Sequence, residues 1–263
     1  MCLSAIIPIK ALKINKIPKL LNSYFRTFLF WIVNAFIVFL CWLTGPILAL
    51  FMKRKTLASQ IWAKIWGKVL TAIATTGFRI EGLENIPKDT PVIYAPNHQS
   101  NLDWMILLAA LPLPFRFVMK KELFKIPLFG TANRRAGYFC LDREAKIGAA
   151  RTLSKVEQTI KAGESVVIFP EGTRTHDGKL GQFKIGSFLV AFETGAPIIP
   201  IAISGSFQIM PRYSMKIKPR KVKVKIGSPI SFGVLKNKTN QEYQMVMDRV
   251  RDGIATMLSE IKE

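Results

Sequence analysis

The sequence predicts an α/β protein whose mixed, largely parallel sheet is flanked by helices and preceded by a hydrophobic, membrane-anchoring helical segment. From Phe78 onward, short β-branched runs alternate with turns and helical stretches, which is typical of a sheet covered by helices. Before that point, the 24 residues from Phe28 to Phe51 carry no charge. A chain of 263 residues can hold one large domain and an appendage, so we expect a division into residues 1–77 and 78–263.

The composition indicates a folded protein that binds polyanions. The chain has 38 Lys and Arg against 17 Asp and Glu, a net charge of +21, yet 49% of its residues are hydrophobic, which excludes a disordered chain. Such a charge favours nucleic acid, anionic lipid headgroups or phosphorylated substrates as partners. Cys2, Cys41 and Cys140 are too few and too scattered for a disulfide framework or a zinc cluster, so a reducing compartment is expected.

The positive charge is concentrated in two blocks. Residues Met1 to Ile80 contain eleven Lys and Arg, residues Thr194 to Gln241 contain nine, and neither block contains an acidic residue. The rest of the chain is nearly neutral, with 18 basic and 17 acidic side chains. We therefore predict that the two blocks share one side of the fold and that this side faces anionic lipid.

The uncharged run from Phe28 to Phe51 predicts a helix that enters a membrane. As a straight helix it would measure roughly 36 Å, against roughly 30 Å for the hydrocarbon core of a bilayer. Gly45 and Pro46 predict a break after Thr44, because proline cannot donate the helical hydrogen bond. Basic residues flank the run on both sides, so we favour a hairpin that dips into one leaflet, with the chain from Lys53 onward lying along the headgroups. A full span is the alternative.

Two other interpretations of this run are a signal peptide and a buried core helix. No small-residue cleavage site follows it, and Lys53-Arg54-Lys55 would halt translocation, so a signal peptide is disfavoured. A core helix does not require so long an uncharged stretch between clusters of basic residues. Four tryptophans fit either an interfacial anchor or a core: Trp31, Trp42, Trp62 and Trp66.

Seven strands and four helices are predicted after this segment. Each strand is a short apolar or β-branched run, and each of the first three helices lies between two strands. The strands are Phe78–Glu81, Val92–Ala95, Arg116–Met119, Tyr138–Leu141, Val166–Phe169, Ile198–Ile203 and Lys221–Ile226. Apolar residues of the last helix recur at steps of three and four, which predicts that it packs on the sheet. The helices are Leu102–Ala110, Ala145–Ala162, Gly186–Glu193 and Asn240–Ile261.

The last predicted strand, Lys221–Ile226, alternates lysine with valine or isoleucine. Strict alternation predicts one buried face and one basic, exposed face. The lysines suit contact with lipid headgroups, and they equally suit protection of a strand at the edge of the sheet. The sequence is compatible with both interpretations.

Two polar motifs follow apolar strands that end in proline. The first strand runs to Pro96 and is followed by Asn97–Asp103, and the second runs to Pro170 and is followed by Glu171–Arg174. Ligands of open α/β sheets gather beyond the carboxyl ends of the strands. Both motifs are therefore placed where a functional site is expected.

The first motif pairs a histidine with a nearby carboxylate. Ser100 is a good N-cap for the following helix and would put Asp103 at the third helical position, where its carboxylate can reach back over the cap. There it can accept a hydrogen bond from one nitrogen of His98 and leave the other free as a general base. Such a pair can activate a hydroxyl for attack on an acyl group. The plainer alternative is a capping box with a hydrogen-bonded histidine beside it.

The second motif suggests recognition of a phosphate. Gly172 permits close approach of the backbone, and the guanidinium of Arg174 is a planar fork suited to phosphate. The chain has no P-loop string. His98 and His176 lack the spacing of metal ligands, so no metal is expected, and His176 is interpreted as a solvated turn residue.

Four blocks in the same order resemble the glycerolipid acyltransferase family typified by 1-acyl-sn-glycerol-3-phosphate acyltransferase. The resemblance covers roughly Phe78 to Val234. The first block is similar to the His-x4-Asp motif of the family. The blocks are Asn97–Asp103, Lys120–Gly130 with Leu141–Arg143, Phe169–Arg174 and Ile199–Gly205.

The resemblance implies a membrane-bound enzyme that moves a fatty acyl group from acyl-CoA or acyl-carrier protein to the sn-2 hydroxyl of lysophosphatidic acid, giving phosphatidic acid in phospholipid biosynthesis. It implies no cofactor beyond the donor, anionic membrane lipids as partners, and an acyltransferase domain, residues 78–263, on the cytoplasmic side of the inner membrane. By resemblance His98 is the base, Asp103 orients it, and Lys120, ahead of Lys121, meets the oxyanion or the donor phosphates. The acceptor phosphate would be held by Glu171, Gly172, Thr173 and Arg174, with Arg143 as a further candidate.

Two departures from the family concern the acceptor. Phe183–Gly186 has one lysine where the family often has a basic pair, and Thr131–Arg135 is more polar than usual. Another lysolipid or glycerol-3-phosphate is therefore an alternative acceptor. A nucleic-acid-binding protein is disfavoured, because no zinc finger, RNP-type motif or Arg-rich recognition helix occurs. A non-catalytic lipid-binding relative is disfavoured because His98 and Asp103 are both present.

Overall fold

The computed structural model describes residues 23–142, 146–234 and 239–261. Seven strands form one sheet in the order β1-β7-β6-β2-β5-β3-β4, and only the β6–β7 pair is antiparallel. The predicted fold class, a mixed and largely parallel α/β sheet, is confirmed, and each predicted strand lies on an observed one. The strands are β1 Thr75–Glu81, β2 Ile93–Pro96, β3 Phe115–Lys120, β4 Phe139–Leu141, β5 Ser165–Val167, β6 Ile198–Ser204 and β7 Arg220–Ile226.

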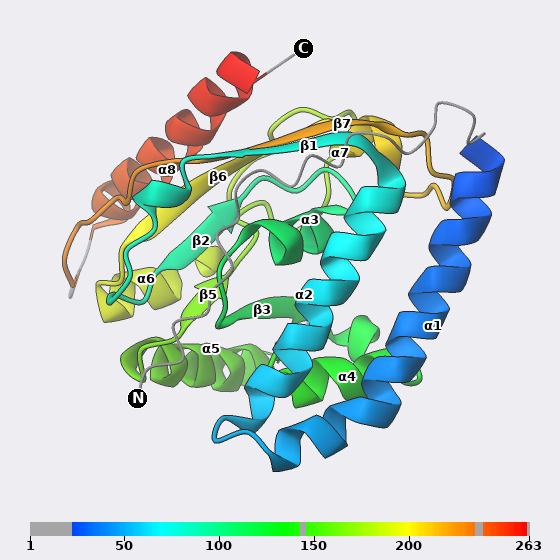
Figure 1. Cartoon of the computed structure of the whole chain (residues 1–263). Coiled ribbons are helices and arrows are strands. Elements are labelled where there is room, and N and C mark those ends of the chain that lie inside the picture. The colour runs from blue at the N-terminus through cyan, green and yellow to red at the C-terminus, as the bar shows by residue number, and fades with distance from the viewer. Residues whose placement is uncertain (1–22, 143–145, 235–238, 262–263) are drawn as a thin grey trace.

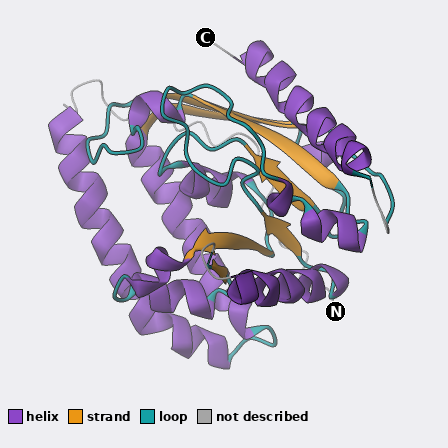
Figure 2. Ribbon diagram, turned by 180° about the vertical axis from the view of Figure 1, so that it is seen from behind, coloured by secondary structure: helices purple, strands orange, loops and turns teal. Residues whose placement is uncertain are grey.

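Helices cover both faces of the sheet, as the views from the two sides show (Figures 1 and 2). The four helices predicted after the anchor are present, and α2, α4 and α7 were not predicted. Three short 3-10 turns complete the described elements, at Leu83–Asn85, Lys121–Lys125 and Ile185–Ser187. The helices are α1 Ser23–Leu50, α2 Lys55–Ala74, α3 Asp103–Ala110, α4 Phe129–Arg135, α5 Lys146–Lys161, α6 Leu189–Thr194, α7 Ser206–Ile209 and α8 Asn240–Ile261.

Two hydrophobic cores lie on opposite faces of the sheet, because successive side chains of a strand point to opposite sides. In β2, Tyr94 enters the core that packs against α1, α2 and α3, whereas Ile93 and Ala95 enter the core that packs against α5, α6 and α8. The prediction that the last helix packs on the sheet is confirmed, since Val250 and Ile254 are fully buried in the second core. Parallel strands buried on both faces explain the continuous apolar runs in the sequence.

Helix α1 runs without interruption through Pro46, so the predicted break after Thr44 is wrong. Proline cannot donate to the carbonyl of Trp42 four residues earlier, and that carbonyl would be left without its helical partner. The Nη1 atom of Arg135, at the end of α4, donates to the Trp42 oxygen at 2.9 Å. A side chain from another element thus supplies the missing hydrogen bond. The sequence around Pro46 does not reveal this contact.

The reversal of the chain occurs after α1, at residues 51–54, and α2 returns along α1 (Figure 1). Arg26, which the sequence placed in a basic flank, is buried and donates from Nη1 to the carbonyls of Ile73 and Thr75 at 3.0 and 3.1 Å. Asn34 accepts a hydrogen bond from the indole of Trp66 at 3.0 Å. One face of α1 is therefore fixed to α2 by polar contacts as well as by packing.

The other face of α1 is apolar and exposed. In the part of the chain that the structure describes, α1 is the single helix long and apolar enough to cross a membrane, and only 22% of its most hydrophobic window is buried. This argues against the core-helix interpretation. Trp66 is a core residue, whereas Trp42 lies at the surface. The exposed apolar side chains of α1 are Phe25, Phe28, Ile32, Phe36, Phe39, Trp42, Leu43, Ile47 and Leu50, with Tyr24 at its start.

Helix α2 belongs to the body of the fold through a close approach to α3. A Cβ atom added at Gly67 would lie 2.6 Å from Cβ of Leu108 and 2.7 Å from the Met105 carbonyl oxygen, so only glycine fits there. Leu70 is fully buried in the same interface. The predicted headgroup segment after Lys53 is thus a packed helix.

Strand β7 lies between β1 and β6, so the edge-strand interpretation of Lys221–Ile226 is wrong. Its alternation is confirmed, since Val222, Val224 and Ile226 are buried. On the other face, Lys225 forms an ion pair with Glu260 of α8. The pairing of β1 with β7 places the end of the first basic block beside part of the second, whereas the lysines of β7 point to the face of the sheet opposite α1 and α2. A shared side that faces lipid stays a prediction.

Candidate active site

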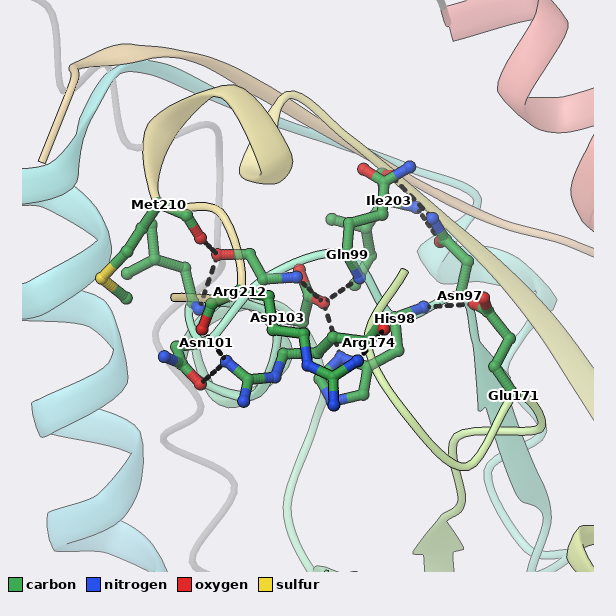
Figure 3. A network of polar contacts seen from close by, with 12 residues as sticks. Asn97, His98, Gln99, Asn101, Asp103, Glu171, Arg174, Ile203, Met210 and Arg212 are labelled. Carbon is green, nitrogen blue, oxygen red and sulfur yellow. Dashed lines mark hydrogen bonds and ion pairs between the residues drawn. The ribbon is translucent and has the colours of Figure 1, made fainter. Parts of the chain in front are cut away.

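The two polar motifs lie side by side because their strands are neighbours. Strand β2 pairs with β5 in parallel, with Ile93 opposite Val166 and Tyr94 opposite Val167. Both strands therefore deliver their motifs at the same edge of the sheet, where ligands of α/β proteins bind. Figure 3 shows the resulting network of polar side chains.

Asp103 holds the imidazole of His98. Its Oδ2 atom accepts a hydrogen bond from His98 Nδ1 at 2.8 Å and further ones from the backbone N–H groups of Gln99 and Ser100 at 2.6 and 2.8 Å. The carboxylate is fully buried, and 18% of the His98 side chain is exposed. Because Nδ1 donates to the carboxylate, the lone pair is on Nε2, the nitrogen that a general base requires.

The remaining contacts of His98 fix the ring in place. Its face stacks on Phe169, with 3.9 Å between ring centroids and 23° between planes. Its backbone N–H donates to Glu171 Oε1 at 2.7 Å, and its carbonyl accepts from the N–H of Thr175 at 2.9 Å. Among the residues that the structure describes, Nε2 has no hydrogen-bond partner. A fixed imidazole with one free basic nitrogen is the result.

The predicted helix cap at Ser100 is wrong in detail. Helix α3 begins at Asp103, and Leu102 occupies the cap position without a side-chain hydrogen bond. The Ser100 hydroxyl accepts from the N–H of Leu102 at 3.1 Å and donates to the carbonyl of Met210 at 2.7 Å. The carboxylate of Asp103 nevertheless reaches back as predicted, since it binds the N–H of Ser100. The long-range hydrogen bond from Ser100 to Met210 takes precedence over the local preference of serine for the cap position.

Glu171 supports the backbone of the site. Its side chain is buried, and its two oxygens accept from the N–H groups of His98 at 2.7 Å and Gly181 at 2.9 Å. Burial raises the pKa of Glu171 to about 7, against the two N–H groups that favour its charged form. Both oxygens are thus occupied by the protein. This geometry suits a residue that positions His98 better than one that binds phosphate, the role that the family resemblance implied.

Arg174 lies next to the His98 loop. Its Nη1 atom donates to Asn101 Oδ1 at 2.5 Å and to the carbonyl of Arg212 at 2.8 Å. Burial lowers the pKa of Arg174, and the nearby charge of Arg212 lowers it further. Gly172 has a left-handed backbone with φ of 67°, and the Thr173 side chain is exposed. The second motif therefore brings one guanidinium beside the proposed base.

The other predicted site residues lie apart from this cluster. Lys120 ends β3, which β5 separates from β2, and its ammonium lies 3.3 Å from Glu122. Lys121 forms an ion pair with Asp142 at 2.6 Å. Arg143 lies outside the described residues. In the part of the chain that the structure describes, no three His, Cys, Asp or Glu side chains are placed to hold a metal ion.

Sequence reasoning missed the residues that join the two motifs to the rest of the fold. The Asn97 amide continues the β2–β6 pairing, since it accepts from the N–H and donates to the carbonyl of Ile203 at 2.7 and 3.0 Å. Gln99 Nε2 donates to the Gly178 carbonyl at 2.9 Å. The density of amide side chains after β2 was a usable signal for them. Arg212 gave no local signal, because it lies in a distant, generally basic segment.

The fold and the site define an α/β acyltransferase, and a protein-family model described as Acyltransferase matches residues 77–204. Among solved structures, PlsC of Thermotoga maritima, a 1-acyl-sn-glycerophosphate acyltransferase, superposes with a TM-score of 0.75 and 27% identity, over 91% of this chain and 97% of that one. The proteins most similar in sequence narrow the class further.

The chloroplastic 1-acyl-sn-glycerol-3-phosphate acyltransferase of Brassica napus is 37% identical over 201 residues, which is 75% of this chain and 58% of that protein. The mouse 1-acyl-sn-glycerol-3-phosphate acyltransferase alpha is 34% identical over 192 residues, 70% of this chain and 65% of that protein. The chain thus spans less than two thirds of the length of these relatives. It belongs to the 1-acyl-sn-glycerol-3-phosphate acyltransferase family.

Proposed function

We propose that this protein transfers a fatty acyl group from a thioester, acyl-CoA or acyl-carrier protein, to the sn-2 hydroxyl of 1-acyl-sn-glycerol-3-phosphate, giving phosphatidic acid. The observation that carries the proposal is the 2.8 Å hydrogen bond between His98 Nδ1 and the buried Asp103 carboxylate, at the strand ends of an α/β sheet. The names of the relatives support the choice of lysophosphatidic acid as acceptor.

In the proposed reaction, His98 Nε2 takes the proton of the acceptor hydroxyl as its oxygen attacks the thioester carbonyl. The tetrahedral intermediate collapses with cleavage of the carbon–sulfur bond, and the leaving thiolate takes the proton back from the imidazolium. The buried carboxylate of Asp103 stabilises that imidazolium and maintains the tautomer. No group of the protein becomes acylated, and every proton is returned.

Proton transfer of this kind contributes about 10²- to 10⁴-fold to a rate. The remainder must come from positioning of the two substrates and from stabilisation of the oxyanion. Arg174 is proposed to hold the acceptor phosphate, with Gly172 and Thr173 lining the same loop. Lys120 is proposed to contact the donor. Because β5 lies between β2 and β3, the donor must extend across the end of β5 to reach Lys120 at the end of β3.

We further propose that residues 1–77 hold the protein at the cytoplasmic membrane through the exposed face of α1, while α2 packs on residues 78–263, which carry out the reaction on the inner side of the membrane. The exposed apolar face of α1 and the basic residues that follow it, Lys53 to Lys55, support a helix that lies in one leaflet with its basic end among the headgroups. In this arrangement the acceptor stays in the bilayer while the water-soluble donor approaches from the cytoplasm.

An acceptor and donor panel tests the proposed function. Purified protein in anionic vesicles is given lysophosphatidic acid, other lysophospholipids, glycerol-3-phosphate or monoacylglycerol, each with acyl-CoA and with acyl-carrier protein. We expect phosphatidic acid as the main product, with one thiol released per acyl group transferred. Faster acylation of another lysolipid or of glycerol-3-phosphate would assign a different acceptor to the same chemistry, and no acylation of any acceptor would refute it.

A further inference from the structure

Arg212 places a second guanidinium beside Arg174 (Figure 3). The two residues hold each other through their backbones, because Arg174 Nη1 donates to the Arg212 carbonyl at 2.8 Å and Arg212 Nη1 lies 3.5 Å from the Arg174 carbonyl. Arg212 Nη1 also lies 2.7 Å from His176 Nε2, which accepts its hydrogen bond. These contacts fix both side chains, and His176 proves to be a partner of Arg212 at the surface.

Neither guanidinium forms an ion pair in the described part of the chain, although the charge of Asp103 acts on Arg174 and opposes the lowering of its pKa. Among the described residues, no carboxylate lies within ion-pair distance of Arg174 or Arg212. Arg174 and Arg212 both make their hydrogen bonds through Nη1. Among the described residues, their Nε and Nη2 atoms have no hydrogen-bond partner. Two fixed cations with free N–H edges repel each other unless an anion lies between them.

The loop that carries Arg212 is attached to the first turns of α1. The indole of Trp31 donates to the Met215 carbonyl at 2.9 Å, and Thr27 Oγ1 accepts from the N–H of Ile217 at 2.9 Å. Lys216 lies 3.8 Å above the ring of Tyr24. Figure 1 shows this loop, between α7 and β7, reaching α1. Helix α1 therefore holds residues 215–217, which follow Arg212 in the same loop.

The same loop exposes apolar side chains next to those of α1. Tyr213, which follows Arg212 in the chain, is 80% exposed. Met215, which precedes the Lys216 that lies above Tyr24 of α1, is 61% exposed. Apolar side chains in a basic loop beside an apolar helix suit the boundary between headgroups and acyl chains. This is the depth at which a membrane lipid presents its phosphate.

We propose that Arg212 is a second phosphate-binding residue of the acceptor site, which with Arg174 grips the phosphate monoester of the lysolipid at the membrane surface. The proposal rests on the proposed function and adds to it a reason for selecting a phosphate monoester. Such a group carries nearly two negative charges, which two fixed guanidinium groups match better than one. Arg212 is a binding residue and takes no part in proton transfer.

Steady-state kinetics of Arg212→Gln test the proposal, with lysophosphatidic acid and monoacylglycerol as competing acceptors in vesicles of constant composition. Loss of charge-assisted hydrogen bonds of this strength corresponds to about a 10- to 100-fold fall in kcat/KM for lysophosphatidic acid, expressed mainly in KM. Activity with monoacylglycerol should change less than about 3-fold. Arg220→Gln is the matched control, since Arg220 is exposed at the start of β7 and loses the same charge without touching the site.

Two further measurements keep the test decisive. Arg212→Lys keeps the charge but not the fork, and we expect intermediate activity, with a thermal midpoint equal to that of the wild type. Equilibrium binding of lysophosphatidic acid to the protein in vesicles, without donor, should weaken about 10-fold or more in Arg212→Gln, whatever the catalytic activity proves to be. An unchanged KM and unchanged binding in Arg212→Gln would overturn the proposal, whereas wild-type protein that binds lysophosphatidic acid but acylates nothing would overturn the proposed function alone.

Discussion

At the scale of single residues, the two oxygens of the Asp103 carboxylate accept unequal numbers of hydrogen bonds. All three of its donors, His98 Nδ1 and the N–H groups of Gln99 and Ser100, converge on Oδ2, whereas the buried Oδ1 atom has no hydrogen-bond partner among the described residues. An asparagine can therefore place its oxygen at the Oδ2 position and its NH₂ group where Oδ1 lies. The loop contacts would persist while the negative charge is lost.

We predict that Asp103→Asn folds with a thermal midpoint near that of the wild type but lowers kcat roughly 10²- to 10³-fold. The magnitude follows from the loss of a unit charge about 4 Å from the imidazolium at an effective dielectric constant near 20. Asp177→Asn serves as the control, because Asp177 is an exposed carboxylate in the neighbouring turn. Unchanged kcat in Asp103→Asn would mean that the carboxylate has no electrostatic role in the reaction.

The chemistry-bearing residues were the predictable part of the site. His98 and Asp103 stand five positions apart on one loop, so a local pattern was enough to pair them. Glu171 and Arg212 act through contacts with residues 73 and 38 positions away, respectively, and their roles follow from strand order and from the attachment of a loop to α1. Such roles depend on topology, which a single sequence does not specify residue by residue.

At the scale of elements, helix α1 depends on α4 at Pro46. Arg135 supplies the hydrogen bond to the Trp42 carbonyl that Pro46 cannot make. We predict that Arg135→Ala lowers the free energy of unfolding by about 0.5–1.5 kcal/mol, the net value of one such bond. In a Pro46→Ala background the alanine N–H takes over the Trp42 carbonyl, and the same change should cost much less. Thermal melts of the four proteins give the coupling, and equal costs in both backgrounds would contradict this role of Arg135.

The elements after Phe78 were predictable because strands and turns alternate clearly there, and parallel strands buried on both faces appear as continuous apolar runs. Helix α2 was not predicted, since its basic residues were interpreted as a membrane-surface segment. Its packing depends on the absence of a side chain at Gly67, next to Leu108. Only the partner helix reveals why glycine is needed at that position.

At the scale of the whole molecule, the exposed face of α1 is the surface that we propose meets the membrane. Phe28 and Phe36 are 65% and 59% exposed on that face, whereas Phe30 is fully buried against the body of the fold. Each exposed phenylalanine would contribute about 1.5–3 kcal/mol if it entered an apolar phase. In this proposal, membrane binding and folding use opposite faces of one helix.

We predict that the double variant Phe28→Ser, Phe36→Ser binds anionic vesicles at least about 100-fold more weakly, with little change in thermal stability. Co-sedimentation with vesicles measures the binding. Met245→Ser is the control, because Met245 is equally exposed but belongs to α8 on the opposite face of the sheet. Vesicle binding that survives the double change would show that α1 does not form the membrane contact.

His98 is proposed to be the base of an acyl transfer to lysophosphatidic acid, and the rest of the mechanism depends on this role. The most direct measurement is the rate of phosphatidic acid formation by purified wild-type protein and by His98→Ala, in the same vesicles and with saturating donor. We predict that His98→Ala lowers kcat by about 10²- to 10⁴-fold while vesicle binding and the thermal midpoint stay unchanged. A variant that forms phosphatidic acid at the wild-type rate would show that His98 is not the base.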